Sequence, residues 1–125
     1  MYIHRYLEPA VKKSLANFPV TAVTGPRQCG KSTLVKHLLE AYPDSVYLDL
    51  ERPSDLRKLD DAEWFFSSQK EKLICIDEVQ RYPELFPLIR SLVDEWNKPG
   101  CFLIQDHEWC RNRFCYENQE YCFRD

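Results

Sequence analysis

The chain has 125 residues, enough for one domain with one hydrophobic core and too few for two domains of ordinary size. Hydrophobic residues make up 44% of the chain and charged residues 30%, which excludes an intrinsically disordered protein. A net charge of -3 argues against a protein that coats nucleic acid, and the lack of a long apolar run or secretory signal predicts a cytoplasmic protein without a membrane span.

Helix and strand patterns alternate at the start of the chain. Residues 2–18 carry apolar side chains at helical spacing, which predicts an amphipathic helix with Pro9 as an unfavourable interior residue. Residues 20–24 are β-branched and apolar, as in a buried strand, and residues 32–42 return to helical spacing. A strand-to-helix loop therefore lies between them.

That loop reads G-x-x-x-x-G-K-S, the phosphate-binding P-loop signature, and it has the strand and helix context that the motif requires. Backbone N–H groups of such a loop, together with the N-terminus of the following helix, surround phosphate groups. We expect Lys31 to neutralise the β- and γ-phosphates and Ser32 to bind Mg2+. The residues predicted to hold ATP are Gly25, Pro26, Arg27, Gln28, Cys29, Gly30, Lys31, Ser32 and Thr33.

A second strand and two short helices are predicted next. Residues 45–50 fit the strand, and residues 52–59 and 61–69 fit the helices, with Ser54 and Asp60 as N-cap residues. An aromatic run in the second helix favours burial in the core over stacking on a nucleic-acid base, because aromatic side chains dominate core burial. It consists of Trp64, Phe65 and Phe66.

The third predicted strand ends in two carboxylates. Residues 73–76 are a continuous apolar run, as in a central strand covered on both faces, and Asp77 and Glu78 follow directly. This is the Walker B pattern. Asp77 is expected to hold Mg2+, usually through water, and Glu78 to orient and deprotonate the attacking water. With the P-loop upstream, the pattern favours this site over a solvated acidic turn.

The remaining patterns complete an α/β fold. Residues 83–98 predict a helix, and residues 101–104 predict a fourth strand. Strands that alternate with helices predict a parallel sheet with flanking helices. Ligands of such sheets bind at the carboxyl ends of the strands, and both the P-loop and the Walker B pair follow strand ends.

The wording of the two motifs resembles a widespread group of prokaryotic AAA-type P-loop ATPases, which have an N-terminal ATPase domain and a poorly characterised C-terminal domain. The resemblance covers residues 2–104 and is carried by VTGPRQCGKSTL at 23–34 and IDEVQRYPELF at 76–86. It implies the sheet order 5-1-4-3-2, ATP with Mg2+, and hydrolysis coupled to an unknown protein or nucleic-acid partner. AAA-type sites are often completed by a neighbouring subunit, so the resemblance is compatible with a homo-oligomer and leaves the oligomeric state open.

The sequence departs from this family pattern after residue 104. We therefore divide the chain into an ATPase core at residues 1–104 and a Cys- and aromatic-rich tail at residues 105–125, and expect the fifth strand and the helical lid to be missing. Gln105 is a candidate for the family's polar sensor residue. Three interpretations of the tail stay open: a truncated or frameshifted product, a short tail that packs beside the first strand, and a zinc site. The zinc ligands would be His107, Cys110, Cys115 and Cys122.

The leading hypothesis is ATP and Mg2+ binding by an AAA-type domain, with Lys31 and Glu78 as catalytic residues. Hydrolysis is expected of full-length relatives, and turnover by this chain is left open. The alternatives are an inactive remnant that at most holds nucleotide and a zinc-stapled binding module. Arg81, like Arg27, fits surface pairing better than a role as an arginine finger, and His37 is interpreted as a structural or surface residue.

Overall fold

The computed structural model describes residues 3–24, 31–106 and 119–122. The described strands are β1 (Val20–Thr24), β2 (Val46–Asp49), β3 (Ile74–Asp77), β4 (Phe102–Asp106) and β5 (Gln119–Cys122). The described helices are α1 (Ile3–Asn17), α2 (Lys31–Leu39), α3 (Pro53–Arg57), α4 (Ala62–Ser68), α5 (Leu85–Trp96) and a 3-10 turn, η1 (Val79–Arg81). Within these ranges no helix combines the length and the apolar character that a membrane crossing needs.

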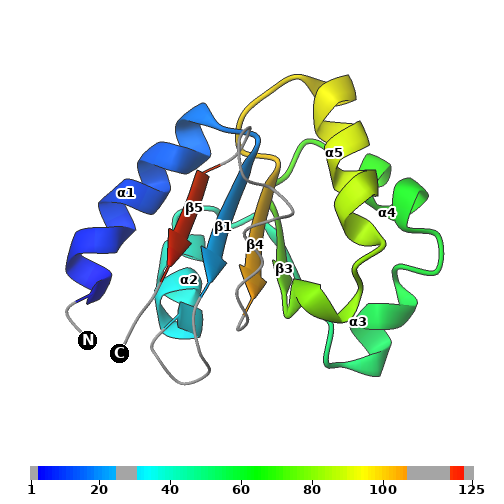
Figure 1. Cartoon of the computed structure of the whole chain (residues 1–125), viewed down its shortest axis with the longest axis horizontal. Helices are drawn as coiled ribbons and strands as arrows, with labels where there is room; N and C mark the ends of the chain where they lie inside the picture. The colour runs from blue at the N-terminus through cyan, green and yellow to red at the C-terminus, as the bar shows by residue number, and fades with distance from the viewer. Residues whose placement is uncertain (1–2, 25–30, 107–118, 123–125) are drawn as a thin grey trace.

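The strands form one parallel sheet in the order β2-β3-β4-β1-β5 (Figure 1). Counted from the other edge, this is the 5-1-4-3-2 order that the family resemblance implied. The predicted α/β fold with flanking helices is therefore confirmed. The sheet order also separates β1 from β3 by one strand, because β4 pairs with both of them.

The fifth strand that we expected to be missing is present. β5 pairs in parallel with β1, with Thr21 opposite Gln119 and Thr24 opposite Cys122, so β1 is an internal strand rather than an exposed edge. This position agrees with the second interpretation of the tail. β5 is a short edge strand held by backbone pairing, and such a strand needs no apolar run that a periodicity search would detect. The proposed division at residue 104 stays a prediction, and β4 continues past it to Asp106.

Two layers of helices cover the sheet, with α1 and α2 on one side and α3, α4 and α5 on the other (Figure 1). Alternation along the strands supplies both cores, since successive side chains of a strand point to opposite faces. In β3, Ile74 and Ile76 pack with the α4 and α5 side chains, whereas Cys75 packs with Val35 and Leu38 of α2. The central strands are therefore apolar on both faces, as the continuous run at 73–76 predicted.

A buried hydrogen bond between two hydroxyl groups connects α1 to β1. Ser14 Oγ lies 2.7 Å from Thr21 Oγ1, and the two residues are 2% and 0% exposed. Two polar groups buried in an apolar layer satisfy each other here, which avoids the free-energy cost of an unpaired buried hydroxyl. The pair therefore sets the position of α1 on the strand that leads into the P-loop.

Local details of the two short helices differ from the prediction. Arg52 and Asp61 are the N-cap residues, not Ser54 and Asp60. Pro53 begins α3, so the residue before it takes an extended conformation and becomes the cap. Asp61 accepts a hydrogen bond from the Trp64 backbone N–H at 3.2 Å.

The aromatic run of α4 is only partly in the core. Phe66 is fully buried, Phe65 is half-buried, and Trp64 is 67% exposed. The prediction that Trp64 is a core aromatic was therefore wrong. Residues two positions apart on a helix point about 200° from each other, so a helix that buries Phe66 against the sheet turns Trp64 to solvent.

Candidate nucleotide site

The elements that flank the P-loop sequence and the strand that carries the Walker B pair meet at the carboxyl ends of the parallel strands. β1, β3 and β4 are parallel and end at the same edge, which is the lower edge in Figure 1. β1 leads into residues 25–30, which lie outside the described residues, and α2 begins at Lys31. The backbone of Lys31 and Ser32 therefore occupies the first turn of α2, and Thr33 is exposed. The phosphate contacts assigned to these residues stay predictions.

Asp77 lies at the end of β3 on the α2 side of the sheet. It is two residues beyond Cys75, which packs against α2, so the two side chains share a face. The Asp77 carboxylate is partly exposed and accepts a hydrogen bond from the Tyr47 hydroxyl, with 2.9 Å between Oη and Oδ2. The carboxylate thus faces the layer whose helix starts with Lys31 and Ser32.

Glu78 has an unusual backbone conformation. Its φ and ψ of 60° and 43° lie in the left-handed region, which a residue with a side chain enters at a cost of roughly 1 kcal/mol. The residue is 7% exposed, and the side-chain amide of Gln80 donates a hydrogen bond to Oε1 at 2.6 Å. The chain therefore turns sharply after β3 and holds the Glu78 carboxylate in a defined, largely water-shielded position.

Two further polar side chains accompany Asp77 on the same face. Gln105, near the end of β4, is fully buried, and its Nε2 lies 3.4 Å from Tyr47 Oη and 3.6 Å from Cys75 Sγ. Burial raises the pKa of the Tyr47 hydroxyl above its usual range, and the charge of Asp77 raises it further, so the hydroxyl stays protonated. Burial likewise raises the pKa of the Cys75 thiol, which makes Cys75 a neutral core residue.

The donor set at this edge fits a magnesium ion. Mg2+ prefers oxygen ligands and usually takes one or two from protein, with phosphate and water completing its octahedron. Asp77 offers a partly exposed carboxylate on the α2 side. In the part of the chain that the structure describes, no three His, Cys, Asp or Glu residues group as a metal site, so a cage made of protein ligands alone is not formed there. His107, Cys110 and Cys115 lie outside the described residues, and the zinc hypothesis stays a prediction.

Two residues interpreted as surface residues are paired. Arg81 Nη1 lies 3.8 Å from Glu51 Oε2, and both side chains are exposed. His37 Nδ1 lies 2.9 Å from Glu8 Oε1, which links α2 to α1. Arg81 thus forms a surface ion pair with Glu51. His37 contacts Glu8, a contact that the sequence did not reveal.

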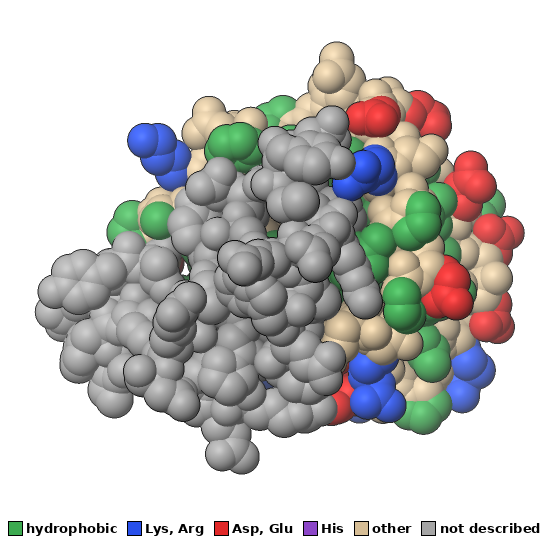
Figure 2. All heavy atoms as spheres, in the orientation of Figure 1, with side chains coloured by type: hydrophobic (Ala, Val, Ile, Leu, Met, Phe, Trp, Pro, Cys, Tyr) green, Lys and Arg blue, Asp and Glu red, His purple; other side chains and the backbone are tan. Residues whose placement is uncertain are grey.

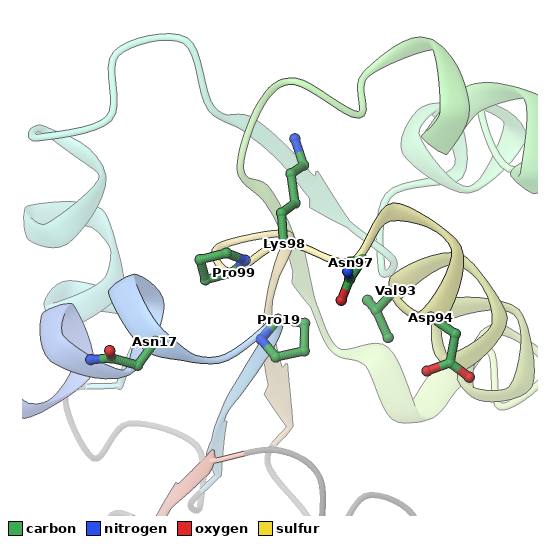
Figure 3. A pocket seen from close by; sticks show the side chains of 7 residues that line it. All are labelled: Asn17, Pro19, Val93, Asp94, Asn97, Lys98 and Pro99. Carbon is green, nitrogen blue, oxygen red and sulfur yellow. The ribbon is translucent and has the colours of Figure 1, made fainter.

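A cavity lies at the opposite end of the sheet, beside the amino ends of β1 and β4 (Figure 3). Its volume is about 350 Å³, and it opens where α1 passes into β1 and α5 passes into β4. Its lining residues are Asn17, Pro19, Val93, Asp94, Asn97, Lys98 and Pro99. These residues precede the strands β1 and β4 or lie at the end of α5, so the cavity is separate from the edge that carries Asp77.

The visible surface on the α3–α5 side carries charged side chains of both signs. In Figure 2 acidic side chains lie along the upper and middle part of that side, and basic side chains lie at its lower end.

Comparison with known proteins gives the family. The model of the AAA domain family matches residues 17–106. Uncharacterized proteins of Mycobacterium tuberculosis and Mycobacterium bovis are each 42% identical over 94 residues, which is 75% of this chain and 21% of theirs. The chain therefore spans about a fifth of the length of these relatives.

Solved structures share the fold. A chain of Drosophila ORC bound to DNA matches with a TM-score of 0.60 and 14% identity, over 98% of this chain and 45% of that one. Cdc6p from Pyrobaculum aerophilum matches with a TM-score of 0.56 and 14% identity, over 85% and 38% of the two chains. Because the family model covers well over half of the chain, including β1 to β4, the chain belongs to the AAA domain family, whose membership supports nucleotide binding.

Proposed function

We propose that this chain binds ATP with Mg2+ at the carboxyl ends of β1, β3 and β4. The observation that carries the proposal is Asp77, a carboxylate at the end of β3 that faces the α2 layer at the edge where β1 enters the P-loop sequence. Lys31 and the residues around it, 25–33, bind the phosphates, and Ser32 and Asp77 hold the metal. When bound, Mg2+ neutralises charge on the β- and γ-phosphates.

Hydrolysis is the reaction that the Walker B pair supports. Glu78 accepts a proton from a water molecule whose oxygen attacks the γ-phosphorus, and the bond from that phosphorus to the ADP oxygen breaks. Glu78 directly follows the end of β3 and is 7% exposed, so its carboxylate is largely shielded from bulk water, as this role requires. The proposal also includes coupling of hydrolysis to a protein or nucleic-acid partner and completion of the site by a second subunit.

A nucleotide-holding domain without turnover is the second candidate. The observation that favours it is the 2.6 Å hydrogen bond from Gln80 to Glu78 Oε1. A carboxylate oxygen that already accepts a short hydrogen bond is a weaker proton acceptor, because the bond stabilises its charged form. Release of Glu78 from Gln80 would then be required for hydrolysis.

Binding of a fluorescent ATP analogue and phosphate release, measured side by side, test both candidates. Lys31→Ala should abolish binding, whereas Lys36→Ala, an exposed lysine on the same helix, is the matched control and should bind normally. Glu78→Gln should retain binding and lose phosphate release. Gln80→Ala should raise phosphate release if the hydrogen bond to Glu78 restrains the base.

The outcomes separate the candidates. Binding and turnover that respond in this way establish an ATPase. Binding without turnover by the wild type, with turnover gained in Gln80→Ala, establishes the restrained form. A folded wild type that binds no ATP analogue with Mg2+ overturns the proposal.

A further inference from the structure

The Tyr47 hydroxyl reaches Asp77 from the neighbouring strand. In the β2–β3 pairing Tyr47 lies opposite Cys75, so Asp77 is its diagonal neighbour two residues further along β3. A long aromatic side chain spans this diagonal on one face of a sheet. The result is the hydrogen bond of 2.9 Å from Tyr47 Oη to Asp77 Oδ2.

The direction of this hydrogen bond is determined by chemistry. A phenol has one hydrogen to donate, and the ionised carboxylate can only accept. The Gln105 amide donates to the phenol oxygen across a longer distance of 3.4 Å. Gln105, Tyr47 and Asp77 therefore form a directed chain that crosses from β4 to β2 and returns to β3.

We propose that Tyr47 is a positioning residue that orients the Asp77 carboxylate for Mg2+, with Gln105 holding the Tyr47 hydroxyl in place. This inference rests on the proposed ATP and Mg2+ function. A carboxylate has about four lone-pair positions, so one hydrogen bond from Tyr47 restricts its rotation and leaves capacity for a metal or a metal-bound water. Groups that orient a metal ligand typically change metal affinity 10- to 100-fold when they are removed.

Gln105 takes a different role here from that of a phosphate sensor. Its Nε2 is directed to Tyr47 and Cys75, and its Oε1 has no hydrogen-bond partner among the described residues. A fully buried amide in this position acts on the metal site through Tyr47.

The test compares nucleotide affinity with and without metal. The dissociation constant of a fluorescent ATP analogue is measured in EDTA and in saturating Mg2+. The value in EDTA divided by the value in Mg2+ gives the contribution of the metal to binding. Tyr47→Phe keeps the ring that packs on the sheet and removes only the hydroxyl. We expect it to lower the ratio about tenfold through weaker binding in Mg2+, with the EDTA value unchanged.

Control variants separate positioning from a general loss of structure. Tyr42→Phe removes a hydroxyl from another partly buried tyrosine of the same core cluster and should leave the ratio unchanged. Asp77→Asn should lower the ratio, and adding Tyr47→Phe to it should have no further effect, because the hydroxyl acts through Asp77. Gln105→Met, in which Tyr47 is intact, should lower the ratio about twofold and keeps the test decisive if Tyr47→Phe folds poorly.

Three results overturn the inference. A Tyr47→Phe ratio equal to that of the wild type shows that the hydroxyl does not support the metal. If that equal ratio arises from equal weakening in EDTA and in Mg2+, the effect of Tyr47→Phe is merely structural. A full Tyr47→Phe effect on the ratio in the Asp77→Asn background shows that the hydroxyl does not act through Asp77. A wild type that binds the analogue in neither condition overturns the proposed function together with this inference, whereas the other results concern Tyr47 alone.

Discussion

The buried pair of Ser14 and Thr21 predicts an unusual pattern of stability. Its two hydroxyls lie 2.7 Å apart between α1 and β1, and both residues are almost fully buried. Ser14→Ala removes one partner and leaves the Thr21 hydroxyl unpaired beside the sheet. Thr21→Val replaces the other hydroxyl by a methyl group of similar size. The two single variants and the double variant form a complete cycle.

The expected change in the free energy of unfolding depends on whether a variant leaves a buried hydroxyl without a partner. Leaving the Thr21 hydroxyl unpaired costs about 2 kcal/mol, and the better helix propensity of alanine returns about 0.5 kcal/mol. Thr21→Val should cost less, about 1 kcal/mol, because a serine in a helix can turn its hydroxyl to the carbonyl four residues earlier. The double variant leaves no unpaired hydroxyl, so we expect its free energy of unfolding within about 0.5 kcal/mol of the wild type.

Urea denaturation followed by circular dichroism measures the four free energies of unfolding. The expected order places the double variant above both single variants. An additive result, with the double variant least stable, would refute the reasoning, since it would mean that each hydroxyl has its own favourable interaction apart from the other.

Two further predictions concern burial and pH. Phe66→Ala should lower the free energy of unfolding by about 3–5 kcal/mol because Phe66 is fully buried. Trp64→Ala on the same helix should change it by about 0.5 kcal/mol or less because Trp64 is exposed. Urea denaturation compares the two variants, and equal losses would contradict the assignment of Phe66 to the buried face of α4 and Trp64 to the exposed face. Burial raises the pKa of Asp55, but the Asp49 backbone N–H at 2.9 Å and Lys58 at 3.2 Å outweigh it and hold that pKa below its usual value. A folded-state pKa below the unfolded-state value of about 4 stabilises the fold at pH values above 4, and this contribution disappears as pH falls through the folded-state pKa. Asp55→Asn removes the titrating group. Unfolding curves at pH 3–6 should therefore show that the free energy of unfolding falls less with acid in Asp55→Asn than in the wild type.

The sequence predicted the central sheet because its strands are apolar on both faces. The continuous run at 73–76 and the β-branched run at 20–24 each became a strand close to the predicted bounds. The carboxylate at Asp77 could be placed at the strand end for the same reason. These signals are local, and each is read from neighbouring residues in the chain.

The features that the sequence missed depend on residues far apart in the chain. β5 is an edge strand whose pairing with β1 uses backbone groups, which leave no side-chain pattern. The contact of Tyr47 with Asp77 depends on the register of β2 against β3. A diagonal neighbour of this kind becomes visible only when that register is known. Trp64 was assigned to the core by residue type, although its helical phase relative to Phe66 already pointed it away.

The internal position of β1 has a consequence for how the chain folds. β1 pairs with β4 at Phe102 and with β5 at Gln119, so both of its neighbours are made long after it is synthesised. The entropic cost of closing a loop rises, although slowly, with its length, and contacts between residues far apart in the chain form more slowly than local ones. The strand that leads into the P-loop is therefore expected to be placed late, after β2 and β3 have paired. A ligand bound at the end of β1 would then stabilise the completed sheet, so that nucleotide and the last step of folding are thermodynamically coupled.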